Sequence, residues 1–263
     1  TLPQRHERLV KSGDMKPAIL VMPDTFTTLG GNQFVDSPVL GNWSTWLAEA
    51  LKPAIEERYA TNGKFGLVGK SSGGYGAVIN AMLQPNVWDG VACHSGDMGF
   101  ETMFMPTFAE TLTHVSRYGS AQDYVAHVQK AERLSGPDFH SLMICAMAAS
   151  YDPRPSTNEN PLGIVLPVNT ETADILPEAW NQWLKFDPIQ MVNAHHQHLA
   201  ELDALFIDCG GQDQYHIQYG SRKFVELLNS FEIEHTWEEF AGTHSGIDHR
   251  LDLSFAFLSQ KLA

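Results

Sequence analysis

The sequence predicts an α/β fold in which a mostly parallel sheet has helices on both faces. Two observations support this prediction. Short apolar runs alternate with helical patterns in both halves of the chain, and the most specific motif lies between one such run and the helix after it. A chain of 263 residues is long enough for one large domain with a substantial core. We therefore expect a single domain spanning residues 1–263.

Five runs have the short, β-rich character of buried parallel strands, namely residues 18–22, 65–69, 88–94, 204–209 and 234–240. Four segments have the apolar spacing of helices that pack on such a sheet, namely residues 44–59, 73–83, 215–228 and 247–262. Pro53 is expected to kink or divide the first helix, because proline removes a helical hydrogen bond.

The middle of the chain departs from this alternation. Residues 97–190 contain several helical patterns and a segment rich in Pro and Asn at 151–167, but no clear strand. This block is longer than an ordinary connection between strands. We expect a helical insertion over the carboxyl edge of the sheet, where open α/β sheets bind their ligands. The alternative is that these helices pack without contacting a substrate.

The composition excludes several classes of function. The formal charge is −14, and so acidic a surface disfavours nucleic acid and anionic membranes as partners. No apolar stretch approaches the roughly 18 residues of a membrane span. Cys93, Cys145 and Cys209 are odd in number and lie in apolar contexts, which favours buried reduced thiols over a disulfide or zinc framework. A reducing, cytoplasmic compartment is therefore the mild preference.

The most specific motif is Gly69-Lys70-Ser71-Ser72-Gly73, a GxSxG sequence between an expected strand and an expected helix. A nucleophile on so tight a turn has a strained backbone, and the flanking glycines leave room for it. The turn also places Ser71 at a helix N-terminus, where free N–H groups favour developing negative charge. Ser72 is the rival nucleophile, but its preceding flank would be Lys70. We therefore expect Ser71 to be the nucleophile.

A serine nucleophile needs a base, and the base needs a carboxylate to orient it. Asp213 follows the expected strand 204–209, and His244 follows the expected strand 234–240. All three residues also have an ordinary interpretation: Ser71 as a turn serine, Asp213 as a helix-capping aspartate and His244 as a loop histidine. The agreement of all three favours catalysis, with His244 as base. Asp208 and Asp248 compete with Asp213, and Asp208 is expected to be a buried structural carboxylate.

Four segments resemble the esterase D, antigen 85 and enterochelin-esterase-like branch of the α/β hydrolases, namely residues 18–24 (AILVMPD), 65–98 (FGLVGKSSGGYGAVINAMLQPNVWDGVACHSGDM), 205–215 (LFIDCGGQDQY) and 237–250 (WEEFAGTHSGIDHR). The resemblance implies an α/β-hydrolase fold and the hydrolysis or transfer of acyl groups from small esters or thioesters. It places Ser71, Asp213 and His244 on the catalytic triad. The Ser72 backbone N–H falls on one arm of the oxyanion hole. This chemistry requires no metal or cofactor.

One departure concerns the second oxyanion donor. Members of this branch carry a further core strand before the one that matches residues 18–22, and its loop supplies that donor. Only residues 1–17 precede the match here, and TLPQRHERLVKSG has the pattern of a helix. Either an N-terminal segment is absent from this sequence, which begins with Thr1, or the donor comes from elsewhere. Loss of one donor costs about 10² to 10³ in rate.

Two other motifs are discounted. A phosphate-binding GxxxxGK[ST] loop would need glycine where Lys64 stands, and a strand fills the space between. His195, His196 and His198 point to different sides of a helix and are expected to form a polar face, with no metal site. Seven large side chains of the insertion could line an acyl pocket or form ordinary core, namely Phe100, Met103, Phe104, Met105, Phe108, Trp180 and Trp183.

These observations favour a serine carboxylesterase that hydrolyses small to medium acyl esters through an acyl-enzyme intermediate. A thioesterase of the S-formylglutathione hydrolase type, or an acyltransferase, would use the same three residues. A non-enzymatic binding scaffold is disfavoured because all three triad residue types are present. The sequence determines neither the substrate nor the oligomeric state.

Overall fold

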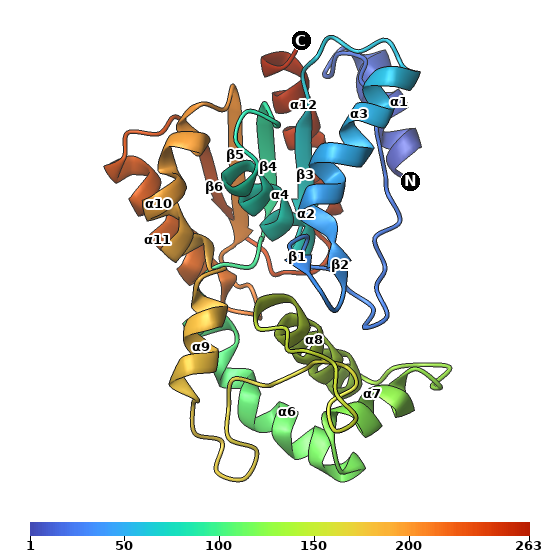
Figure 1. The fold of residues 1–263 in the computed structure, drawn as a ribbon. Coiled ribbons are helices and arrows are strands. Elements are labelled where there is room, and N and C mark those ends of the chain that lie inside the picture. Colours follow the sequence, from blue (N-terminus) through green and yellow to red (C-terminus); the bar gives the residue numbers. More distant parts are fainter.

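A computed structural model describes residues 1–263 and shows two lobes (Figure 1). The upper lobe contains a four-stranded sheet and the helices that cover it. The lower lobe is formed by a single stretch of chain between the second and third strands of that sheet. No helix combines the length and the apolar character that crossing a membrane requires.

The sheet consists of β3 (Gly66–Lys70), β4 (Gly90–His94), β5 (Ala204–Gly210) and β6 (Thr236–Phe240). The strands lie in this order, and every neighbouring pair is parallel. Strands β4 and β5 are buried along their whole length. Each strand lies within two residues of the run that predicted it, so the predicted parallel sheet is confirmed.

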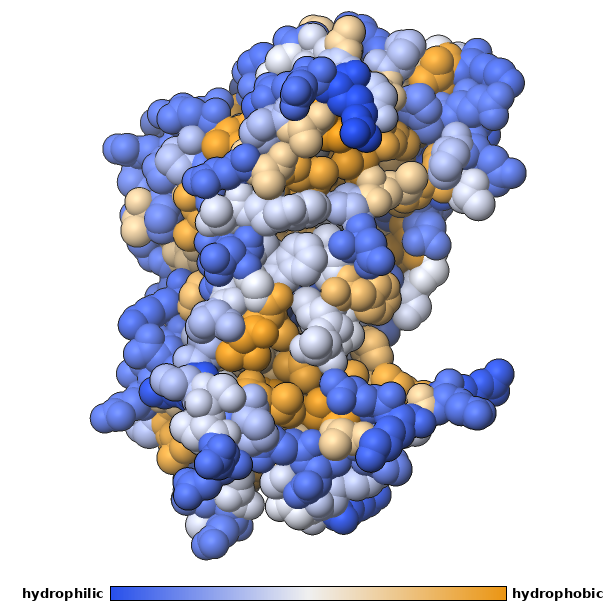
Figure 2. All heavy atoms as spheres, turned by 45° about the vertical axis from the view of Figure 1, so that its right-hand side comes forward, coloured by the Kyte–Doolittle hydropathy of each residue, from blue (hydrophilic) through white to orange (hydrophobic).

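The fifth expected strand, at residues 18–22, is wrong. This segment forms no strand, and Ile19, Val21 and Met22 are 41–56% exposed. A strand needs a neighbour with which to exchange backbone hydrogen bonds. β3 pairs only with β4 and is the edge of the sheet, and residues 18–22 exchange no backbone hydrogen bonds with its open side. Figure 2 brings this side of the molecule forward and shows apolar side chains at the surface of the upper lobe.

Helices cover both faces of the sheet, as the sequence predicts. The elements on one face are α4 (Ser72–Leu83), α10 (Pro188–Ala200) and α11 (Ile217–Ser230). The elements on the other face are α1 (Leu2–Ser12), a 3₁₀ turn at Asp248–Arg250, and α12 (Leu251–Lys261). Leu258 of α12 packs on Ala92 and Phe206 of the sheet.

The helix expected at 44–59 is divided near Pro53, as predicted. It consists of α2 (Trp43–Trp46), a π-helical turn at Leu47–Leu51, and α3 (Lys52–Arg58). Pro53 lies in the first turn of α3, where a missing N–H costs little. A short hairpin of β1 (Asp36–Ser37) and β2 (Gly41–Asn42) precedes these helices.

The lower lobe lies beyond the carboxyl ends of the strands (Figure 1). It contains α5 (Phe100–Met103), α6 (Phe108–Val115), α7 (Ala121–Val128), α8 (Gly136–Tyr151), α9 (Pro177–Leu184), and 3₁₀ turns at Met105–Thr107 and Ser116–Tyr118. Most of its large side chains form one buried aromatic cluster, in which Trp183 packs against Phe104, Phe108 and Tyr151. Met105 is 37% exposed and lies outside this cluster. Of the seven large side chains that the sequence analysis considered, all except Met105 are therefore core.

Candidate active site

Ser71 lies on the turn between β3 and α4. Its backbone has φ 56° and ψ −128°, a conformation that costs energy for any residue with a side chain. A Cβ on Gly69 would lie 2.1 Å from the carbonyl oxygen of Gly73, so only glycine permits this turn. The Ser71 N–H donates to the His94 carbonyl at 2.9 Å, which fixes the turn to β4. The Ser71 hydroxyl does not cap the helix and is partly exposed.

His244 and Asp213 form a direct pair. The Nδ1 atom of His244 lies 2.7 Å from Oδ2 of Asp213, and both side chains are buried. The other carboxyl oxygen of Asp213 accepts the Tyr215 N–H at 2.9 Å. The backbone N–H of His244 donates to the Gln214 side chain at 3.0 Å. The two loops that follow β5 and β6 are thus fixed to each other by side chains of both.

Ser71, Asp213 and His244 follow β3, β5 and β6 and so lie along one edge of the sheet. The structure joins Asp213 to His244, whereas the Ser71 hydroxyl makes no hydrogen bond to His244. Because a carboxylate can only accept, the proton between the pair belongs to Nδ1 of His244. Nε2 of the same ring is then the free base.

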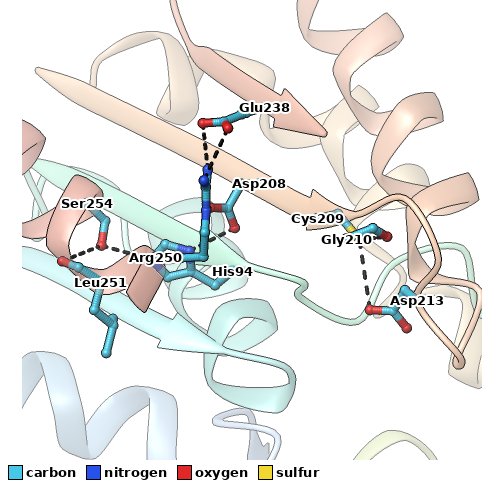
Figure 3. Close-up of polar contacts among 9 residues, drawn as sticks. All are labelled: His94, Asp208, Cys209, Gly210, Asp213, Glu238, Arg250, Leu251 and Ser254. Carbon is cyan, nitrogen blue, oxygen red and sulfur yellow. Dashed lines mark hydrogen bonds and ion pairs between the residues drawn. The ribbon is translucent and has the colours of Figure 1, made fainter. Parts of the chain in front are cut away.

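The two competing aspartates lie elsewhere. Asp208 is fully buried inside β5, where one oxygen lies 2.8 Å from His94 Nδ1 and the other accepts from Arg250 Nε at 2.8 Å. Arg250 in turn pairs with Glu238 of β6 (Figure 3). Asp208 is therefore the structural carboxylate that the sequence predicts. Asp248 is exposed and makes no contact with His244.

Tyr215 connects the lower lobe to His244, a role that the sequence analysis missed. Its ring packs edge-on against the His244 imidazole, with 4.8 Å between the ring centres. Its hydroxyl lies 3.2 Å from Nε2 of His140 on α8. Burial, with the nearby carboxyl groups of Asp213 and Asp97, raises the pKa of Tyr215, so the hydroxyl stays protonated and can donate. No spacing in the sequence indicates this contact across 75 residues.

A second polar group lies beside the Ser71 turn. The Gln33 amide donates to the Ser72 hydroxyl at 3.0 Å, and this hydroxyl donates to Oδ2 of Asp97 at 3.4 Å. Burial raises the pKa of Asp97 to about 7, although the nearby His244 and the Ser72 hydroxyl lower it. Asp97 follows β4 at the same sheet edge, a signal that could have identified it. Gln33 carries no such signal.

Two of the three histidines of α10 contact different neighbours. His196 stacks on Phe231 with 4.2 Å between ring centres, and His198 Nδ1 lies 2.6 Å from the Met82 carbonyl oxygen. No group of three or more His, Cys, Asp or Glu side chains is arranged to hold a metal ion. The three cysteines are free and buried, as predicted.

Comparison with protein families identifies the family of this chain. The sequence matches the family described as "Putative esterase" over residues 6–258, nearly its whole length. The chain belongs to this esterase family. Membership of this family makes the protein a hydrolase. It does not distinguish an oxygen ester from a thioester as the substrate. No curated protein matches the esterase significantly.

Solved structures share the fold of this esterase at low sequence identity. A ferulic acid esterase has a TM-score of 0.60 at 16% identity, covering 100% of this chain and 78% of its own. MPT51 (FbpC1) of Mycobacterium tuberculosis has a TM-score of 0.53 at 14% identity, with coverage of 88% and 74%. An S-formylglutathione hydrolase from Agrobacterium tumefaciens has a TM-score of 0.53 at 15% identity, with coverage of 100% and 79%. These similarities establish the α/β-hydrolase type of fold.

Proposed function

We propose that this esterase is a serine carboxylesterase in which Ser71 is the nucleophile, His244 the general base and Asp213 the carboxylate that orients it. The observation that carries the proposal is the strained Ser71 turn at the same sheet edge as the buried pair of His244 and Asp213. Strained serine turns of this kind are typical of nucleophiles that must project from the sheet. Membership of the esterase family supports the same chemistry.

The reaction follows from the protonation states of these groups. Nε2 of His244 accepts the hydroxyl proton as Ser71 Oγ attacks the ester carbonyl carbon. Asp213 stabilises the imidazolium that forms. The tetrahedral intermediate collapses as the His244 proton passes to the leaving alcohol, which leaves an acyl group on Ser71. Water then attacks this acyl-enzyme with His244 again as base, and the second tetrahedral intermediate collapses as the His244 proton returns to Ser71 Oγ, which breaks the bond to the acyl group and releases the carboxylic acid.

The developing oxyanion needs N–H donors. The backbone N–H of Ser72 stands at the start of α4, where the helix leaves its first N–H groups unpaired. We assign it as one arm of the oxyanion hole. The second arm is not assigned, because the residues before the segment 18–22 form the helix α1 and not the further strand and loop that the family resemblance implies.

Residues 97–190, which include the lower lobe, are proposed to form a helical cap that covers the site. Its position beyond the strand ends and the contact of His140 with Tyr215 support this role. Figure 2 shows apolar side chains at the narrow waist between the two lobes. Apolar side chains at this place would favour acyl groups of small to medium size.

The nucleophile is tested with a fluorophosphonate probe and a p-nitrophenyl short-chain ester. The wild-type esterase should be labelled on the peptide that contains Ser71, and Ser71→Ala should lose both labelling and turnover while keeping its fold. Ser116→Ala, which changes an exposed serine of the lower lobe, is the matched control and should retain both. Substantial ester turnover by Ser71→Ala would refute the assignment.

The acyl acceptor and leaving group are tested separately. The rates of three reactions are measured with the same enzyme preparation: hydrolysis of an oxygen ester, hydrolysis of an S-acyl glutathione, and acyl transfer to an added alcohol. A carboxylesterase should prefer the first. Preference for the second would favour a thioesterase, a class to which one protein of similar fold belongs. Preference for the third would favour an acyltransferase.

A further inference from the structure

Asp97 is a fully buried carboxyl group that the proposed reaction does not use. It follows β4, which lies between β3 and β5 in the sheet. The loop that carries Asp97 therefore lies between the turn of Ser71 and the loop of Asp213. A carboxyl group at this place is surrounded by the residues assigned to catalysis.

Close backbone packing brings Asp97 against the first turn of α4. A Cβ on Gly96 would lie 2.8 Å from the Tyr75 backbone nitrogen, so the chain can approach α4 this closely only with glycine at 96. The approach places Oδ2 of Asp97 3.4 Å from the Ser72 hydroxyl. The same hydroxyl accepts the Gln33 amide. The side chains of Gln33 and Asp97 thus fix the residue that follows the nucleophile.

Two acceptor atoms of this cluster lack partners. Oδ1 of Asp97 and Oε1 of Gln33 are buried without any hydrogen bond. An unpaired buried carboxylate oxygen is costly, and the cost falls when the carboxyl is protonated or when a cation lies nearby. The nearest source of positive charge is His244, whose imidazolium form counteracts the effect of burial on Asp97.

We propose that Asp97 is a positioning residue of this esterase: it holds the first turn of α4 through Ser72, and it supplies a second buried carboxyl group, besides Asp213, that interacts electrostatically with His244. The proposal rests on the assignment of Ser71 and His244 made above. The His244 imidazolium that forms when Ser71 loses its proton lies in the field of both carboxyl groups. Asp213 stabilises it by a hydrogen bond, and Asp97 stabilises it by charge.

The other titratable groups around Asp97 and His244 come from every element packed against them, namely Cys93 on β4, Tyr75 on α4, Tyr151 and His140 on α8, and Tyr215 after β5. Burial raises the pKa of the cysteine and of the three tyrosines, so these groups are neutral near pH 7. His140 contacts Tyr215 and not His244 itself. The carboxylates assigned to act on His244 are therefore those of Asp213, which it contacts, and of Asp97, whose pKa His244 lowers.

The test is a pH titration of the His244 imidazole by NMR in the wild type and in Asp97→Asn. The signal is assigned by its absence from His244→Gln. The titration midpoint of His244 should move to lower pH by about one unit in Asp97→Asn, because the imidazolium loses one neighbouring carboxylate. An unchanged midpoint in a folded Asp97→Asn protein would overturn the proposal.

Asp187→Asn is the matched control. Asp187 is also a buried carboxyl, but its oxygens accept the N–H groups of Gly99 and Phe100, and the substitution should not move the His244 midpoint. If Asp97→Asn does not fold, Asp97→Ser removes the same charge in a smaller side chain and is titrated in its place. Failure of both to fold while Asp187→Asn folds would assign Asp97 to stability alone and overturn the proposal.

Activity gives a second readout. The acid limb of the kcat/KM profile should move to lower pH in Asp97→Asn together with the NMR midpoint. A loss of kcat/KM that is equal at every pH would show a structural role only and would contradict the proposal. The NMR titration reports the electrostatic contact even if Ser71→Ala keeps its activity. Failure of the assigned nucleophile and failure of the role of Asp97 are thus distinguishable.

Discussion

Nδ1 of His94 lies 2.8 Å from Oδ1 of Asp208, in a buried pair that has the same geometry as that of His244 with Asp213. Oγ of Ser254 lies 2.8 Å from the other ring nitrogen of His94 (Figure 3). The connectivity is that of a serine triad, but Ser254 is fully buried, so no substrate can reach it. Serine, histidine and aspartate side chains therefore serve two purposes in this protein. One set joins α12 to the sheet on one face of β5, and the other forms the candidate site at the end of β5.

The first prediction concerns this structural network. Asp208→Asn should lower the free energy of unfolding by about 3 to 5 kcal/mol, because Arg250 then loses its fully buried charged partner and keeps only the half-exposed Glu238. Urea unfolding measures this loss. The control is Glu238→Gln, which removes the half-exposed partner of Arg250 and should cost less than about 1 kcal/mol. Equal losses in the two variants would contradict the prediction.

The second prediction concerns the cysteines. Burial raises the pKa of Cys145 and of Cys209 to about 12, and it also raises that of Cys93. We expect no reaction with a disulfide reagent at pH 8 in the native protein, and reaction of all three thiols in guanidinium chloride. A folded-state pKa above the unfolded value gives stability that is complete below about pH 9 and is lost progressively as the pH rises from 9 to about 12. Rapid modification of the native protein would show that a thiol is accessible.

The third prediction concerns the stability cost of Asp97. Burial raises the pKa of this carboxyl from 3.8 to about 7. A raised folded-state pKa gives stability that is complete below pH 3.8 and is lost as the pH rises to 7. Asp97→Asn does not undergo this loss. The free energy of unfolding of the variant, minus that of the wild type, should therefore increase by about 4 kcal/mol between pH 3.8 and 7. Urea unfolding across this range tests the prediction, and a constant difference would exclude it.

Much of this architecture could be predicted because its signals are local. Strands β4 and β5 are continuous apolar runs, and the Ser71 turn is marked by glycines on both sides. The choice of Asp213 over Asp208 follows from position alone, since one follows a strand and the other lies within it. Residues 18–22 have the same local signal as the strands. They form no strand because strand formation depends on a neighbour that no local pattern reveals.

The residues that the sequence analysis missed depend on packing between distant segments. The contact of His140 with Tyr215 joins the two lobes, and no spacing in the sequence indicates it. Asp97 follows a strand, as Asp213 does, but its burial results from the approach of Gly96 to α4. Sequence spacing can indicate which residues share a sheet edge. It cannot indicate which of them are excluded from water.

The last prediction concerns Tyr215, whose ring supports His244 and whose hydroxyl contacts the lower lobe. Tyr215→Ala should lower kcat/KM by about tenfold or more, because the imidazole loses the ring that holds its orientation. Tyr215→Phe keeps that ring and removes only the hydroxyl, so its effect should be within about threefold, roughly the value of one partly exposed hydrogen bond. Steady-state kinetics with a short-chain ester measures both.

A double-mutant cycle identifies the partner of the hydroxyl. His140→Ala should resemble Tyr215→Phe, and the combined variant should be no worse than either, because both changes remove the same hydrogen bond. Effects that multiply would mean that His140 and Tyr215 act independently, and the lower lobe would then lack this connection to His244. An effect of Tyr215→Phe as large as that of Tyr215→Ala would assign the role to the hydroxyl and not to the ring.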